Sequence, residues 1–249
     1  VRHINTVLGS YSTNYNAGET SRASNIALAA KSLDNIILSP GERLSYNDTV
    51  GERTKERGYL LAHVYEEGEV RDGIGGGICQ VSSTLYNAAL VAGLKIVSRR
   101  PHMMPVSYVE TGRDATVDWT SRIDLVIENN LPRSIVLRTF AEGGTVSCLF
   151  LGAAEDKPEK VEIVRSGLAT IEYETIEIPD DTLKPGERVE EQAGRRGFRA
   201  TVHRIIKRPG QPEVRELLSQ DHYAKRDAKV RVGPPADSES KLPQPDPKP

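Results

Sequence analysis

One short stretch, Gly75-Gly76-Gly77-Ile78-Cys79, constrains the fold of this chain more than any other. Consecutive glycines can take backbone conformations that other residues avoid, so the chain can turn sharply there and approach a ligand closely. Directly after Cys79 the pattern becomes helical, with apolar residues at Val81, Leu85, Ala88 and Ala92. Gly93 then stands where a left-handed C-terminal cap is expected. The sequence therefore predicts a glycine loop that runs into a helix, with Cys79 at the junction.

The position of Cys79 has three interpretations from local features alone. At the start of a helix, a thiol lies near the positive end of the peptide dipoles, which favours the nucleophilic thiolate and suits covalent catalysis. A free cysteine is also commonly a small buried hydrophobic residue. A glycine run before a helix can instead bind an anion through its amides. A nucleophile, a structural cysteine and an anion-binding loop all remain open at this point.

The composition gives no sign of a nucleic-acid-binding, membrane-spanning or disulfide-rich protein. A net charge of −2 over 249 residues gives no sequence-wide attraction to nucleic acid. No apolar run reaches the length of a membrane span, so membrane contact is expected only through an anchor upstream of Val1. Two cysteines, Cys79 and Cys148, are too few for a disulfide framework. A disulfide between them would leave no free, nucleophilic thiol at the helix start.

The first 152 residues have the pattern of an α+β domain, with a helix packed on an antiparallel sheet. A helix is expected at 24–33, in addition to the one after Cys79. Strands are expected at 59–65 and 95–98, and an antiparallel meander is expected from the segments 124–128, 134–140 and 145–151.

The remaining residues predict a second domain and a tail. A charged, proline-containing segment at 152–160 is typical of a linker. Residues 161–233 alternate β-like segments with glycines and contain too little contiguous apolar sequence for a thick core, which predicts an elongated, mainly β domain. Residues 234–249 are rich in proline and polar residues, as expected of a flexible tail.

Several motifs follow one another in a fixed order in the first domain. They are Ser39-Pro40-Gly41-Glu42, Val50-Gly51-Glu52-Arg53-Thr54, Gly58-Tyr59, the stretch from Gly75 to Tyr86, Pro101-His102, Pro105-Val106-Ser107-Tyr108 and Gly112-Arg113-Asp114-Ala115-Thr116-Val117. Together they resemble the VanW domain, named from a vancomycin-resistance cluster, and the ordered set is far more specific than any single motif. Residues 161–233 resemble a G5 domain, a glycine-punctuated β module of bacterial surface proteins.

The resemblance implies an exported, extracellular bacterial protein associated with the cell wall. Some VanW-domain proteins are peptidoglycan L,D-transpeptidases with a cysteine nucleophile, and G5 domains are associated with binding N-acetylglucosamine-containing polymers or with extended spacers. The implied function is cross-linking of stem peptides through an acyl-enzyme on Cys79, with peptidoglycan peptides and glycan as partners and no cofactor. The alternatives are a cysteine L,D-carboxypeptidase at the same site and a wall-binding protein without turnover.

Two residues of the matched motifs are candidates to activate Cys79. His102 is the candidate general base because histidine titrates near neutral pH; otherwise it is a loop histidine bonded to a backbone carbonyl. Asp114 is expected either to orient the imidazole as the third member of a triad or to pair with Arg113. Zinc chemistry is not expected, since no paired spacing of metal ligands supports it.

Side chains for substrate binding are also candidates. Arg53 and Arg113 have guanidinium forks that suit the donor's carboxylates, with solvated surface charge as the alternative. Trp119, the only tryptophan, either lines a groove for glycan or peptide or belongs to the core.

The first helical turn supplies the remaining candidates. Gln80, Ser82 and Ser83 follow Cys79 closely. Their side chains either donate hydrogen bonds to an oxyanion or substrate or cap the helix.

Overall fold

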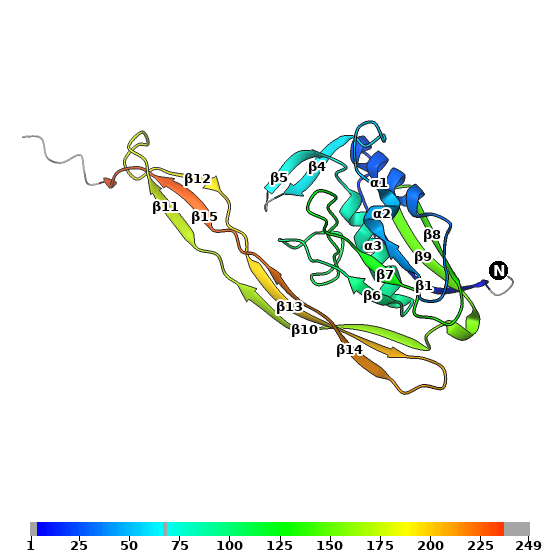
Figure 1. Ribbon diagram of the computed structural model, residues 1–249. Helices are drawn as coiled ribbons and strands as arrows, with labels where there is room; N and C mark the ends of the chain where they lie inside the picture. Colours follow the sequence, from blue (N-terminus) through cyan, green and yellow to red (C-terminus); the bar gives the residue numbers. More distant parts are fainter. Residues whose placement is uncertain (1–3, 67–68, 237–249) are drawn as a thin grey trace, which may run out of the picture. The chain divides into compact units, whose positions relative to one another are not determined.

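The computed structural model describes residues 4–66 and 69–236, and its elements are shown in Figure 1. The chain forms two compact units. The larger unit extends through Ala169 and also takes in Arg199–Tyr223, and the smaller one comprises Thr170–Phe198 and continues from Ala224. From residue 237 onwards, the tail expected at 234–249 lies outside the described residues.

The larger unit is built on a four-stranded antiparallel sheet in the order β1-β9-β8-β2. Its strands are β1 (Thr6–Asn14), β2 (Ile36–Leu38), β8 (Ile135–Glu142) and β9 (Thr145–Gly152). Helix α3 (Ile78–Val91) packs against β1 and β9, and α1 (Thr20–Leu33) packs against β8 (Figure 1). Alternate residues of β9 point into the resulting core, which buries Val146, Cys148 and Phe150. An α+β fold with helices on an antiparallel sheet is thereby confirmed.

Helix α3 is buried on nearly all sides, as a helix at the centre of a core must be. Its polar residues are compatible with burial because they are hydrogen-bonded: Thr84 bonds to Thr13, and Asn87 donates to a backbone carbonyl oxygen. Gly93 has a φ of 72°, and the amides of Gly93 and Leu94 bond back to the last turn of the helix. The predicted glycine cap is therefore present.

Smaller sheets flank this core. One is ordered β3-β7-β6 and another is the hairpin β4-β5, with the short helix α2 between β3 and β4. A third is ordered β10-β13-β14. Their bounds are β3 (Arg43–Ser45), α2 (Tyr46–Val50), β4 (Leu61–Glu66), β5 (Glu69–Ile74), β6 (Lys95–Ser98), β7 (Val126–Glu128), β10 (Lys160–Ile171), β13 (Gly197–Lys207) and β14 (Val214–Tyr223).

Two sequence-based details are corrected by the structure. Helix α1 begins at Thr20 rather than at the expected residue 24, with Glu19 before it and no side-chain cap. The expected meander is correct for the β8–β9 hairpin but wrong for β7, which pairs with β3 and β6 in another sheet. The chain leaves the β3-β7-β6 sheet after β7 and enters the four-stranded sheet at β8. Asn129 stabilises this turn by donating to the backbone carbonyls of Leu38, at the end of β2, and of Arg133, just before β8.

The smaller unit contains a sheet in the order β11-β15-β12, formed by β11 (Thr175–Pro179), β12 (Arg188–Gln192) and β15 (Ala228–Val232). Strands β11 and β15 are parallel, whereas β12 and β15 are antiparallel. Ala228 is buried, but Ile176 is 46% exposed, so the apolar core is thin, as the sequence predicts. In the described part of the chain, no helix has both the length and the apolarity required to cross a bilayer.

Candidate active site

The glycine loop brings Cys79 to the first turn of α3. Gly75 and Gly77 have φ angles of 85° and 105°, which residues with a side chain rarely adopt. Gly76 is required for a different reason: a Cβ there would lie 2.5 Å from the backbone oxygen of His63 on β4. The loop can therefore press against the β4-β5 hairpin and still turn into the helix.

Cys79 is half-buried, and its Sγ lies 3.5 Å from the carbonyl oxygen of Val117. Burial alone raises the pKa of this thiol, but the hydrogen bond and the positive charge of His102 outweigh burial and hold the pKa below its ordinary value. Cys148 is also a free thiol, but it is fully buried, and burial raises its pKa far above the usual range. The two cysteines thus differ sharply in their capacity to act as nucleophiles.

Asp114 fixes His102 at two points. Its Oδ2 lies 2.6 Å from the ring nitrogen Nδ1 of His102 and also accepts the backbone N–H of the same residue at 2.6 Å. Burial lowers the pKa of His102, but Asp114 and Cys79 together raise it to about 9. The histidine therefore carries a proton at neutral pH and faces a thiol with a lowered pKa, which favours an imidazolium–thiolate pair.

Asp114 is itself held in a buried, charged network. Arg99 donates from Nε to the backbone oxygen of Asp114 at 2.5 Å and from Nη2 to its Oδ1 at 3.2 Å. Burial raises the pKa of the Asp114 carboxyl, but His102 and Arg99 outweigh it and keep the pKa below its ordinary value. The carboxylate is thus ionised behind the imidazole, as a residue that stabilises imidazolium must be.

The sulfur lies in a cleft of about 320 Å³ whose wall includes Arg22, Gln80, His102 and Tyr108. A second hollow of about 330 Å³ shares Arg22, His63, Gln80 and Tyr108 with it. Among the described residues, no group of three or more histidine, cysteine, aspartate or glutamate side chains is arranged to hold a metal ion.

The three residues of the first helical turn take different positions. Gln80 lines the cleft; its Oε1 accepts from Arg22 at 2.6 Å, and its Nε2 donates to the backbone of Asn14 at 2.9 Å. Ser82 and Ser83 are fully buried and donate to the carbonyl oxygen of Ala115 at 2.6 and 3.4 Å. The serines therefore connect α3 to the segment that carries Asp114.

The other three candidates, Arg53, Arg113 and Trp119, are not among the residues that line the cleft. Arg53 donates to Asn47 and to the carbonyl oxygen of Gly51. Arg113 donates to Asn87 at 2.6 Å rather than pairing with the Asp114 carboxylate, and it stacks on Tyr11 at 5.0 Å. The ring of Trp119 is covered by Arg122 at 5.0 Å. The structure thus gathers Cys79, Gln80, His102 and Asp114.

Tyr108 and Arg22 are among the cleft residues that were not sequence candidates. Tyr108 belongs to one of the ordered motifs, which was the available signal; burial and then the charge of Cys79 raise the pKa of its phenol well above the usual value. It is therefore a protonated donor close to the sulfur. Arg22 on α1 had no local signal, because a single arginine on a helix has no distinguishing pattern.

Family models match two regions of the chain. A family model described as VanW like protein matches residues 21–151, more than half of the chain, and a G5 domain model matches residues 164–235. The chain is 46% identical over 145 residues to the uncharacterized protein YoaR of Bacillus subtilis (strain 168), covering 58% of this chain and 48% of YoaR.

A second relative is the vancomycin B-type resistance protein VanW of Enterococcus faecalis (strain ATCC 700802 / V583), 31% identical over 129 residues, covering 47% of this chain and 46% of the relative. The chain thus matches about half the length of these two proteins. Among solved structures, the IgA1 protease G5 domain (23% identity, TM-score 0.22) covers 31% of this chain and 95% of its own. The match to the G5 domain of HP0197 (16% identity, TM-score 0.20) covers 30% of this chain and 96% of that domain.

Proposed function

This chain belongs to the family of VanW-like proteins, and from that premise we propose that it is a cysteine L,D-transpeptidase that cross-links peptidoglycan stem peptides. A VanW-like region followed by a G5 domain indicates a cell-wall-related protein. The observation that carries the proposal is the partly exposed thiol of Cys79, which faces a histidine held protonated by a buried aspartate.

The first half-reaction is acyl transfer to the enzyme. The Cys79 thiolate attacks the carbonyl carbon of the third residue of a donor stem, and the bond from that carbon to the nitrogen of the terminal D-amino acid breaks. The departing amine takes the proton of His102, whose raised pKa of about 9 keeps that proton available. The products are a thioester on Cys79, a neutral imidazole and a free D-amino acid.

In the second half-reaction His102 acts as a general base, whereas in the first it acts as a general acid. Thioester formation removes the negative charge of Cys79, which is one of the causes of the raised pKa of His102. The pKa of His102 is then lower, so the imidazole stays unprotonated and is available to take a proton from the amine of a neighbouring stem as the amine attacks the thioester. A new amide forms, the thiolate leaves, and the imidazolium–thiolate pair is restored.

Two cleft residues support substrate binding. Arg22 donates to the neutral amide of Gln80, so its charge remains to attract a carboxylate of the donor. Tyr108 presents a protonated phenol close to the sulfur and is our candidate donor to the oxyanion of the tetrahedral intermediate.

Product analysis tests the proposal. The purified chain is incubated with a tetrapeptide-stem muropeptide, and the products are separated by mass. A cross-linked dimer with release of one D-amino acid is expected, and Cys79→Ala is expected to form none. Tripeptide without dimer would instead indicate an L,D-carboxypeptidase, with water as the acceptor.

The G5 match favours a second candidate function, binding to wall glycan without turnover. In that case the Cys79→Ala chain sediments with purified sacculi as well as the wild type does, and neither protein changes the muropeptide profile. Altered muropeptides with the wild type alone would exclude this alternative as a complete account.

A further inference from the structure

Strand β14 closes the network behind His102 with two buried side chains, Tyr223 and Asp221. Both residues fall in the region matched by the G5 model, whereas Asp114 falls in the VanW-like region. All of them nevertheless belong to the same compact unit. Residues of the G5-matched region therefore lie next to the candidate active site of the VanW-like region.

Tyr223 contacts Asp114 directly. Its hydroxyl donates to Oδ1 of Asp114 at 2.5 Å and accepts the backbone N–H of Gly112 at 2.8 Å. The direction of the first bond is fixed, because an ionised carboxylate only accepts and burial beside it raises the pKa of this phenol far above its usual range. Oδ1 is thus held by Tyr223 while Oδ2 remains free to hold His102.

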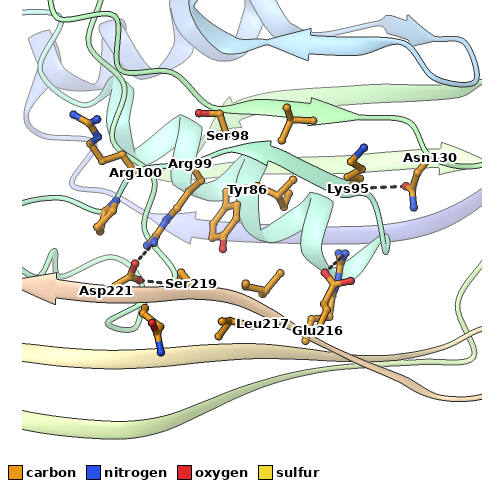
Figure 2. A pocket seen from close by; sticks show the side chains of 16 residues that line it. Tyr86, Lys95, Ser98, Arg99, Arg100, Asn130, Glu216, Leu217, Ser219 and Asp221 are labelled. Atoms are coloured by element: carbon orange, nitrogen blue, oxygen red, sulfur yellow. Dashed lines mark hydrogen bonds and ion pairs between the residues drawn. The ribbon is translucent and has the colours of Figure 1, made fainter.

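Asp221 acts on the same carboxylate through Arg99. The guanidinium of Arg99 lies between the two acids, with Nη1 2.5 Å from Oδ1 of Asp221 and Nη2 3.2 Å from Oδ1 of Asp114. Figure 2 shows Arg99 and Asp221 meeting at the edge of a cavity of about 740 Å³, where Ser219 also donates to Asp221. These three charged side chains are almost completely buried, so each one depends on its partners.

The approach of the strands to the loop at Gly112 is close. A Cβ at Gly112, where φ is 91°, would lie 2.6 Å from Cγ2 of Val202 on β13. The glycine of the VanW-like motif therefore allows β13 and β14 to pack against the loop that carries Asp114.

We propose that Tyr223 and Asp221 are positioning residues for the Cys79–His102–Asp114 site, so that the G5-matched region completes the active site. This inference rests on the proposed role of Cys79 as nucleophile. It also implies that deletion of the G5-matched region exposes Arg99 and Asp114 to solvent. Loss of activity after such a deletion would therefore not be evidence for a wall-binding role of that region.

The test uses the full chain with Tyr223→Phe and Asp221→Asn, and it reads the rate of Cys79 alkylation by iodoacetamide. We expect each variant to slow alkylation near pH 7 about tenfold, the scale of one charge-assisted hydrogen bond. The rise of the rate with pH should move to higher pH, because an aspartate that is poorly held stabilises the imidazolium less. The downfield proton resonance of His102 Nδ1–H should shift or broaden.

Matched controls lie on exposed positions. Tyr173→Phe makes the same chemical change at an exposed tyrosine. His222→Ala changes the residue between Asp221 and Tyr223, on the exposed face of β14. Both should retain the wild-type rate, pH profile and resonance. Thermal unfolding of each variant separates a local effect from loss of the fold.

A folded Tyr223→Phe chain with an unchanged pH profile and His102 resonance overturns the proposal, even if its rate is lower. If Tyr223→Phe does not fold, the same readouts on Asp221→Asn decide. Alkylation needs no muropeptide, so the expected shifts in a chain without cross-linking activity would count against the proposed function alone.

Discussion

The ring nitrogen Nδ1 of His102 lies 2.6 Å from Oδ2 of Asp114, and both side chains are buried beside the half-buried Cys79. This contact explains why a histidine in a buried site carries a raised pKa, where burial alone would lower it. The charge of the imidazolium in turn lowers the pKa of the thiol. The contact between these two motifs is thus one of the causes of the reactivity of the sulfur.

The first prediction concerns pH. The wild-type thiolate should persist below the ordinary pKa of cysteine, so alkylation should be fast at neutral pH and should fall only as acid protonates the sulfur. In His102→Gln, burial still raises the pKa of Cys79 but nothing lowers it through an imidazolium. Alkylation near pH 7 should fall at least about tenfold, because a rise of one in pKa removes that share of thiolate. Equal pH–rate curves for the two proteins would contradict the ion pair.

The second prediction concerns Tyr108. Phenylalanine at this position keeps the ring but removes the donor proposed for the oxyanion. The kcat for donor turnover should fall about 100-fold, the typical cost of one such donor. Iodoacetamide forms no oxyanion, so the alkylation rate should change little. Parallel losses in turnover and alkylation would show that Tyr108 acts on the sulfur instead.

The third prediction concerns Arg22. In Arg22→Gln, the affinity for a donor with free carboxylates should fall about tenfold, or about 1.4 kcal/mol. Arg113→Gln is the matched control, since its guanidinium is bonded to Asn87 and does not line the cleft. Titration with a carboxyl-amidated donor completes the test: Arg22→Gln should bind it as the wild type does. An equal loss for both donors would assign Arg22 to support of Gln80.

The fourth prediction concerns the glycine loop. Gly76→Ala places a Cβ 2.5 Å from the oxygen of His63, so the loop must move and carry Cys79 with it. We expect a loss of about 1–3 kcal/mol in stability and slower alkylation. Gly41→Ala has no atom within 4 Å and only a positive φ of 78° to oppose it. It should cost about 1 kcal/mol or somewhat more and leave alkylation unchanged, since Gly41 is not part of the site.

Local patterns in the sequence predicted the elements whose partners are close along the chain. The glycine loop, α3 and its Gly93 cap, and the β8–β9 hairpin all depend on neighbouring residues. The pairing of β7 with β3 was not predictable in the same way, because it joins segments about eighty residues apart. Turn residues indicate where a strand ends but not which sheet the next strand enters.

The same limit applies to the site. Residue type and motif order singled out Cys79, His102 and Asp114, which the structure brings together. They did not indicate the direction of a side chain, so Arg113 was a candidate although it stacks on Tyr11. Tyr223 could not be found, since it reaches Asp114 from another family region, 109 residues along the chain.

The most direct test of the central claim is intact-protein mass spectrometry of the full chain after mixing with a tetrapeptide-stem muropeptide. The account predicts an adduct equal in mass to the donor without its terminal D-amino acid, attached to Cys79 and released by hydroxylamine. Cys148→Ala should form the adduct and Cys79→Ala should not. Cross-linked product formed by Cys79→Ala at the wild-type rate, or an adduct on another residue, would contradict the account.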